Sequence, residues 1–316
     1  MEELDVVVSG LVFQDLVLGL PTPPRPGTEV WASDSHESPG GIANFAVALA
    51  RLGLRTGMAA VFGADDLGAR LWDHLAADEG IDLSLSRTVP GWPTPLTVAL
   101  AYDNDRALVT RGSTPPLSAD DLIATPPPAK AVAAHIGPWP NAWLAKAKAA
   151  GSLVFADVGW DPSERWDPAV LEQLEYCDVF LPNADEAMAY TRTTTPAAAL
   201  DALAAKVAVV VVSDGADGAL AVDGRTGERV AVPAYPVPAA DTTGAGDVFA
   251  AGFIAATLWE LPLAQRVRFA ALTAALSVTR LGGADSAPRW VDLARWQSAH
   301  PEDRHLHALI SAHSGR

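Results

Sequence analysis

The sequence predicts an α/β protein whose mostly parallel sheet is covered by helices on both faces. Two observations support this prediction. Short apolar runs rich in β-branched residues recur along the chain, for example SLVFADVG (152–159) and VAVVVVSDG (207–215). Continuous apolar runs are typical of strands that are buried on both faces. Stretches with apolar residues at helical spacing lie between them, for example GGIANFAVALARLG (40–53). Such alternation indicates parallel βαβ units.

Other segments extend the pattern. The run LDVVVSGLVF (4–13) is predicted to be the first strand, and DDLGARLWDHLAADEG (65–80) a helix that ends at its last glycine. TPLTVALAYDNDRALVTRG (94–112) and GALAVDGRTGERVAVPAY (218–235) are predicted hairpins, because each contains two strand-like runs about a polar turn. Further helices are predicted at 167–176, 246–259 and 262–281.

Two segments, Leu11–Pro39 and Pro95–Gly112, interrupt this alternation. We expect them to pair into a small sheet, called the lid, over one edge of the main sheet, within a single domain that spans residues 1–316. We expect the lid to close on a substrate and to exclude water. An exposed apolar lid face favours a homodimer through the lids. The residues expected on that face are Leu18, Val30, Leu96, Val98, Leu100 and Leu108.

The composition limits the functional classes. The chain has 316 residues, a hydrophobic fraction of 49% and a formal net charge of −16 at pH 7. This acidity argues against nucleic acid and against an anionic membrane as the main partner. No stretch approaches the roughly 18 apolar residues of a membrane span, and the acidic N-terminus lacks the basic region of a signal peptide. The single cysteine, Cys177, excludes an internal disulfide. We therefore predict a cytoplasmic protein.

The stretch AADTTGAGDVFAAGF (239–253) combines bare backbone with one acid at the predicted start of a helix. In an open α/β sheet, ligands bind beyond the carboxyl ends of the strands. Gly244, Ala245 and Gly246 have little or no side chain, so their N–H groups can face one anion at the helix N-terminus. Asp247 suits a base that takes a proton from an attacking hydroxyl in phosphoryl transfer. The residues alone leave a second interpretation open, in which these groups only cap the helix.

These motifs resemble those of the PfkB (ribokinase-like) carbohydrate kinase family. DTTGAGDVFAAGF (241–253) is similar to its C-terminal motif, and GGIANFAVALARLG followed by RTGMAAVFG (55–63) to its N-terminal motif. PNADEA (182–187) resembles its Asn-x-x-Glu motif, and VVSDGADGAL (211–220) its nucleotide-loop strand. The resemblance implies a ribokinase-like three-layer sandwich with a small β-sheet lid. It also implies transfer of the γ-phosphoryl group of ATP to a hydroxymethyl group of the acceptor.

The resemblance implies roles for individual residues. Asp247 matches the catalytic base, and Gly244, Ala245 and Gly246 match the anion hole. The positions that match acceptor contacts are Asp15, Gly40, Gly41 and Asn44. The positions that match the nucleotide loop are Ser213, Gly215 and Gly218.

The resemblance also implies two sites for cations. Asn183 and Glu186 match the motif that organises Mg²⁺ through water, and the same pair suits a helix capping box. A site for a monovalent cation such as K⁺, which is optional in the family, matches Asp241, Thr243 and Ser286.

We expect the acceptor to be a neutral sugar. Phosphosugars need cations near their phosphate, whereas the lid mixes arginines with acids: Arg25, Arg106 and Arg111 with Glu29, Asp34, Glu37, Asp103 and Asp105. Two departures from the family pattern argue against ribose and leave the adenine contact undefined. Phe45 follows Asn44 where ribokinases often carry Gln, and Ala271 lies where an Asn near the adenine is common. A nucleoside kinase and a non-catalytic sugar-binding relative stay open as alternatives.

Overall fold

The chain folds around an eight-stranded sheet in the order β14-β13-β12-β11-β10-β9-β1-β4. The computed structural model describes residues 4–102, 105–161 and 163–313. The strands of this central sheet are β1 (Leu4–Ser9), β4 (Thr56–Ala59), β9 (Ala129–Ile136), β10 (Leu153–Val158), β11 (Val179–Phe180), β12 (Val209–Ser213), β13 (Ala219–Asp223) and β14 (Glu228–Val232). Neighbouring strands from β4 to β12 are parallel, and β13 and β14 form an antiparallel hairpin at one edge. The predicted mostly parallel sheet is confirmed.

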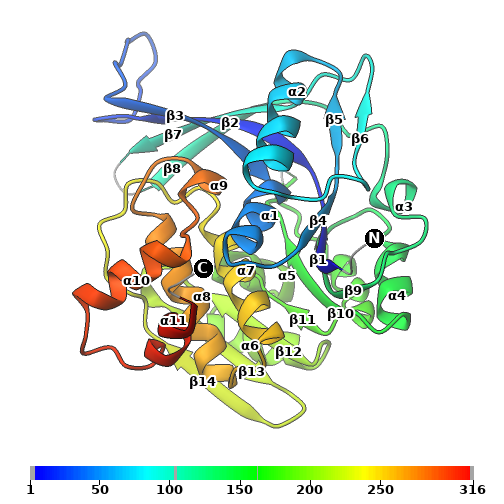
Figure 1. Ribbon diagram of the computed structural model, residues 1–316, viewed down its shortest axis with the longest axis vertical. Coiled ribbons are helices and arrows are strands. Elements are labelled where there is room, and N and C mark those ends of the chain that lie inside the picture. Colours follow the sequence, from blue (N-terminus) through cyan, green and yellow to red (C-terminus); the bar gives the residue numbers. More distant parts are fainter. Residues whose placement is uncertain (1–3, 103–104, 162, 314–316) are drawn as a thin grey trace.

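Helices cover both faces of the sheet and make three layers (Figure 1). Successive strand residues face opposite sides, so Val6 and Val8 lie in one core and Val7 in the other. The first core lies under α1 (Ile42–Arg51), α2 (Asp66–Asp73), α7 (Ala245–Leu258) and α8 (Leu263–Ser277). The second lies under α3 (Ala119–Leu122), α4 (Ala142–Ala149), η2 (Pro168–Tyr176), α5 (Ala184–Thr191) and α6 (Pro196–Ala204). The predicted three-layer sandwich is confirmed.

Two predicted helices differ in winding. The helix expected at 167–176 is the 3₁₀-helix η2, and the one expected at 65–80 is α2 followed by the π-helical turn η1 (His74–Asp78). The remaining elements are β5 (Val61–Gly63), β6 (Arg87–Val89), η3 (Gly215–Asp217), α9 (Gly283–Ser286), α10 (Trp290–Ala299) and α11 (His307–His313). Within the described ranges, no helix combines the length and apolar character needed to cross a membrane.

The predicted first strand is in fact two strands. β1 ends at Ser9 in the central sheet, and β2 (Val12–Gly19) belongs to the lid. Gly10 lies between them, where an added Cβ would lie 3.0 Å from the Cβ of Ile42 at the start of α1. The apolar run shows no break there because the strands on both sides of Gly10 are buried, as Val8 and Val12 are.

The lid is a separate four-stranded sheet in the order β3-β2-β7-β8. Its other strands are β3 (Asp34–Gly41), β7 (Leu96–Tyr102) and β8 (Asp105–Arg111). The lid lies at one end of the sandwich, at the upper left of Figure 1. Its strands fall within the two predicted lid segments, except that β3 continues through Gly40 and Gly41. The predicted turn residues Asp103 and Asn104 lie outside the described residues.

The strand register corrects one residue of the predicted apolar lid face. Leu108 pairs with Ala99, and Val109 pairs with Val98. Directly paired residues share a face and successive residues alternate, so Leu108 lies on the face of buried Ala99. Val109, which is 64% exposed, joins Val98 in place of Leu108. The sequence could not show this because the pairing depends on the turn between β7 and β8.

The loop between β12 and β13 generates a prediction about stability. Gly218 has φ +98° and ψ −130°, and an added Cβ would strike the carbonyl oxygen of Val232. Gly215 has φ +50°, and an added Cβ would meet open space. We expect Gly218→Ala to lower the free energy of unfolding by about 3 kcal/mol and Gly215→Ala by about 1 kcal/mol. Urea unfolding of both variants checks this, and equal losses would contradict it.

Candidate active site

The predicted anion hole and base lie at the start of helix α7. Gly244 precedes the helix with φ +71°, and Ala245 is the first helical residue. The N–H of Val248 donates to the carbonyl oxygen of Gly244, so the N–H groups before it have no acceptor within the helix. Gly246 is exposed, and an added Cβ there would meet nothing within 4 Å. The N–H of Ala245 donates to the carbonyl oxygen of Thr242 at 3.3 Å, and the N–H of exposed Gly246 lies at the positive end of a 14-residue helix.

The Asp247 carboxylate is held from two sides. Asn44, in the first turn of α1, donates from Nδ2 to Oδ2 of Asp247 at 2.8 Å. His135, near the end of β9, places Nε2 at 3.4 Å from Oδ1 of Asp247. Asp247 itself keeps 18% of its side chain exposed. A carboxylate that is held on both oxygens and still reaches solvent is suited to accept a proton from a bound hydroxyl.

Glycines let three segments meet at Asn44. An added Cβ at Gly244 would lie 2.9 Å from the Asn44 side chain, and one at Gly283 would lie 2.8 Å from its Oδ1. Asn44 is buried, and its Oδ1 has no hydrogen-bond partner among the described residues. The amide therefore holds Asp247 with its nitrogen and offers its buried oxygen as an acceptor.

Asp15 lies in β2 of the lid and is buried. Its carboxylate occupies the space that a side chain at Gly40 of β3 would need, and its Oδ1 has no hydrogen-bond partner within the described chain. Burial raises the pKa of Asp15 to about 7, and the charges of Asp247 and Asp241 add to this effect. The predicted acceptor residues Asp15, Gly40 and Asn44 thus lie close to the base. Gly41, with φ +66°, precedes helix α1.

Two residues of the site were missed from the sequence, His135 and Asp157. They are register partners on the neighbouring strands β9 and β10. With Asp247 they form a group whose donor and acceptor atoms all lie within 4.8 Å of one another. Burial opposes a charge on His135, but its interaction with Asp247 and the charges of Asp157 and Glu186 outweigh this and raise its pKa to about 9. The sequence feature that could have identified both residues is a polar side chain at the carboxyl end of a buried strand.

Asn183 and Glu186 form the capping box that the sequence allowed. Asn183 Oδ1 accepts from the N–H of Glu186 at 2.9 Å, and Glu186 Oε2 accepts from the N–H of Asn183 at 3.0 Å. Glu186 is buried, which raises its pKa to about 7 although the hydrogen bond from Asn183 opposes the shift. Burial and the charge of Glu186 raise the pKa of Asp157 well above its usual range. The site therefore collects more carboxylate groups than its one imidazolium balances, which suits binding of a cation.

The residues predicted to hold a monovalent cation are all buried: Asp241, Thr243 and Ser286. Asp241 accepts from the N–H groups of Thr243, at 2.9 Å, and Gly282, at 3.0 Å. Ser286 donates to the carbonyl oxygen of Gly283 at 2.8 Å. Asp241 thereby joins the loop before α7 to the loop before α9. These oxygen atoms are of the kind that alkali cations bind, and the site stays a prediction.

The predicted nucleotide loop lies two strands away from β10. Ser213 ends β12 and forms an isolated bridge with Asn183. Gly215 begins the short turn η3, with open space beside it, and Gly218 directly follows that turn. The bridge brings this loop to the start of α5, where the Asn183–Glu186 pair lies. The segments predicted to bind the nucleotide and Mg²⁺ are therefore neighbours. Binding of the nucleotide and of Mg²⁺ by these residues stays a prediction.

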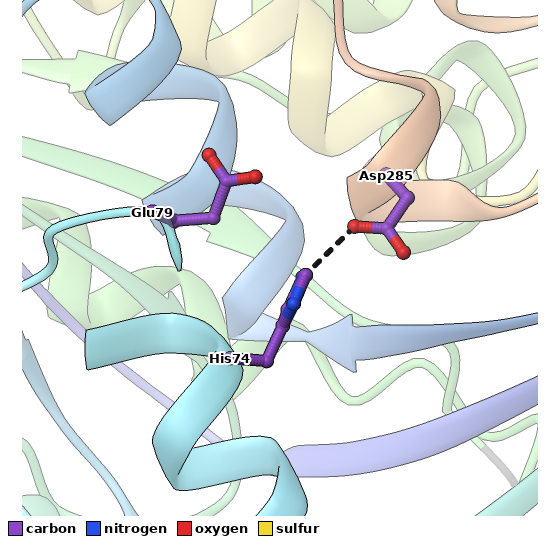
Figure 2. Close-up of side chains that lie close together, drawn as sticks. All are labelled: His74, Glu79 and Asp285. Atoms are coloured by element: carbon purple, nitrogen blue, oxygen red, sulfur yellow. Dashed lines mark hydrogen bonds and ion pairs between the residues drawn. The ribbon is translucent and has the colours of Figure 1, made fainter. Parts of the chain in front are cut away.

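A second group of ionisable residues lies under the lid: His74, Glu79 and Asp285 (Figure 2). Figure 2 shows His74 pointing at Asp285, with 3.0 Å between Nε2 and Oδ1, while Glu79 lies apart. Glu79 is paired with two guanidinium groups, those of Arg51 at 2.6 Å and Arg289 at 3.0 Å. We assign this group a structural role, because two arginines already neutralise the carboxylate that a metal ion would need.

The burial of Asp15 generates a prediction about pH. The folded state holds a proton on Asp15 up to about pH 7, whereas an unfolded Asp releases it near pH 3.9. The free energy of unfolding of the wild type therefore falls as pH rises through this window. Above pH 7 the full cost of the buried Asp15 charge is present. We expect Asp15→Asn to exceed wild type in unfolding free energy at pH 8.5 by on the order of 1–3 kcal/mol.

Urea unfolding of wild type and Asp15→Asn at pH 5 and pH 8.5 measures this difference. Asp34→Asn, at an exposed position of the same lid sheet, is the matched control and should show no such trend. An advantage of Asp15→Asn that shrinks as pH rises would refute the assignment of a buried charge to Asp15.

Comparison with known proteins agrees with this geometry. A family model described as pfkB family carbohydrate kinase matches residues 4–290. A ribokinase from Haemophilus influenzae is 28% identical over 308 residues, which cover 90% of this chain and 95% of that protein. An ATP-dependent ribose-1-phosphate kinase from Halopiger xanaduensis is 31% identical over 291 residues, which cover 90% and 94%.

Solved structures share the fold. Arabidopsis thaliana ribokinase, complexed with ribose and ATP, has a TM-score of 0.76 and 26% identity to this chain, with 93% of this chain and 98% of that chain covered. The likeness in fold thus extends over nearly the whole length of both chains. This chain belongs to the pfkB family of carbohydrate kinases.

Proposed function

We propose that this protein transfers the γ-phosphoryl group of ATP to a hydroxymethyl group of a neutral sugar, with Asp247 as the base. The observation that supports this most strongly is the position of Asp247. It is held by Asn44 and His135 directly after the bare backbone of Gly244–Gly246. An attacking hydroxyl would give its proton to Asp247, while the N–H groups at the start of α7 would stabilise charge on the transferring group.

The lid residues would bind and orient the acceptor. Asp15 is a buried acid with an unpartnered oxygen, and Asn44 offers a second buried acceptor oxygen. Hydroxyl groups are donors that satisfy such oxygens without the desolvation cost of a charge. A sugar held by both residues would lie beside Asp247. We propose that the lid then closes and excludes water, which competes with the sugar for the phosphoryl group.

The nucleotide would lie over Ser213, Gly215 and Gly218, and the exposed Gly215 leaves open space where a side chain would be. Mg²⁺ would be held through water by Asn183 and Glu186, and it would neutralise phosphate charge. The excess of carboxylates over cations around Glu186 fits a divalent ion. The similar Arabidopsis enzyme, whose structure holds ATP, supports the choice of nucleotide. The monovalent cation at Asp241, Thr243 and Ser286 and the homodimer through the lids stay predictions.

One observation favours a second acceptor class. Arg106 in the lid strand β8 donates from Nη1 to Oγ1 of Thr242 at 2.6 Å, which places a cation beside the anion-binding loop. A sugar that already carries a phosphate would benefit from this charge, and one relative is a ribose-1-phosphate kinase. An ADP-release screen over D-ribose, D-fructose, ribose 1-phosphate and adenosine separates the neutral-sugar, phosphosugar and nucleoside alternatives. If none of these four acceptors supports ADP release, the alternative of a non-catalytic sugar-binding relative is favoured.

The proposal predicts a large effect of Asp247→Asn. We expect this variant to keep its fold and to lose turnover by roughly 10²–10⁴-fold, because the hydroxyl no longer has a base. The measurement is ADP release with the panel acceptor that wild type uses best. Asp73→Asn, at an exposed position of α2, is the control and should keep wild-type turnover. Near wild-type turnover of Asp247→Asn would remove Asp247 from the mechanism.

A second prediction concerns magnesium. Glu186→Gln can keep the capping box, because Gln accepts the N–H of Asn183 as Glu does, and only the charge is lost. We expect the Mg²⁺ concentration at half-maximal turnover to rise by roughly 10-fold, with little change in thermal stability. Glu172→Gln, at an exposed position of η2, is the matched control. An unchanged Mg²⁺ dependence would reduce Glu186 to a capping residue.

A further inference from the structure

We infer that His135 is a positioning residue, which fixes the plane of the Asp247 carboxylate so that it can receive the acceptor proton. This inference rests on the proposed role of Asp247 as base and deepens it. No motif singled out His135, and its importance follows from the pairing of β9 with its neighbours at the carboxyl edge of the sheet.

The carboxylate needs an anchor on each oxygen. The terminal torsion of an Asp side chain is broad, so the group turns easily about its Cβ–Cγ bond unless neighbours hold it. Asn44 of α1 holds Oδ2 at 2.8 Å, and His135 of β9 lies 3.4 Å from Oδ1. The two anchors come from different elements and hold different oxygens. Loss of either one would leave the carboxylate free to rotate about the other.

His135 is itself well held. Its neighbours Ala134 and Ile136 are buried, so the end of β9 is fixed in the sheet. The edge of the ring packs against Phe45 of α1, with 5.5 Å between centroids and 76° between planes. Asp157 is its register partner on β10, and its ligand atom lies within 4.8 Å of those of His135 and Asp247. A rigid imidazole can transmit its position to Asp247, whereas a mobile one could not.

The charges around His135 strengthen the contact. The acids that face it are Asp247 from α7, Asp157 from β10 and Glu186 from α5. Although burial opposes ionisation, these acids keep the ring protonated with a pKa of about 9. At neutral pH both ring nitrogens are therefore donors, and the contact to Asp247 is charge-assisted.

A matched pair of substitutions tests the contact. The amide nitrogen of Gln can occupy the place of Nε2, whereas the shorter Asn mimics Nδ1 and cannot reach Oδ1 of Asp247. We expect His135→Asn to lower kcat by on the order of 10- to 100-fold, with KM for ATP and for the sugar changed by less than about threefold. We expect the kcat of His135→Gln to be at least about threefold higher than that of His135→Asn. His305→Asn, at an exposed position, is the control.

A double-mutant cycle shows whether His135 acts through Asp247. Turnover is measured with enzyme in excess over ATP and with D-ribose, or the panel acceptor that wild type uses best. We expect His135→Asn to cost less than about threefold in an Asp247→Asn background, because the group it positions is gone. The same loss in both backgrounds, a change confined to KM, or a Gln variant no better than Asn would overturn the inference.

The cycle separates this inference from the proposed function. Near wild-type turnover of Asp247→Asn refutes the base and, with it, the role of His135. If Asp247→Asn loses turnover as expected but His135→Asn lowers turnover as much in the Asp247→Asn background as in wild type, only the positioning role is refuted. Thermal unfolding of all variants identifies any that fail to fold. If His135→Asn does not fold, His135→Gln, which is closest in shape to the original ring, replaces it in the double-mutant cycle.

Discussion

The site depends on how a small number of buried charges balance at the carboxyl end of the central sheet. Asp247, Asp157 and Glu186 come from three elements, and His135 lies among them as an imidazolium. Burial raises the pKa of Asp157 and of Glu186, and the charge of His135 opposes this effect at both. The remaining excess of acidic side chains would favour a bound cation, and through the cation a phosphate-bearing nucleotide.

Close backbone packing makes this balance possible. Asn44 can reach Asp247 only because Gly244 and Gly283 leave room on both sides of its amide. Helix α1 and helix α7 consequently begin at the same point, and their first turns share one hydrogen bond. Asp241 ties the loops before α7 and α9 together through two N–H groups. Asp247, the proposed base, is therefore held by the geometry of three chain segments rather than by any one of them.

The lid contacts the same loops. His36 of β3 lies 3.2 Å from Oδ2 of Asp285 in α9, whose other oxygen contacts His74. Arg106 of β8 contacts Thr242, two residues before Gly244. Asp15 brings its buried carboxylate from the lid toward Asp247. In the proposed reaction, acceptor binding and phosphoryl transfer would be coupled through these contacts between the lid and the loops of the central sheet. This explains why Asp15, despite its position in a separate sheet, has its pKa raised by Asp247 as well as by burial.

The sequence by itself determined the layered fold, the hairpin at 218–235 and the segments that form the lid sheet, whereas the roles of the site residues that it singled out stay predictions. These features are local: apolar runs, helical spacing, turn residues and short motifs such as DTTGAGD each lie within a few residues. Only the tertiary structure showed that the run 4–13 divides at Gly10 and that Leu108 lies on the inner lid face, because both depend on pairing partners. It also revealed His135 and Asp157. Each is a single polar residue at the end of an apolar strand, and its chemistry arises only when parallel pairing of β9 and β10 places it beside Asp247.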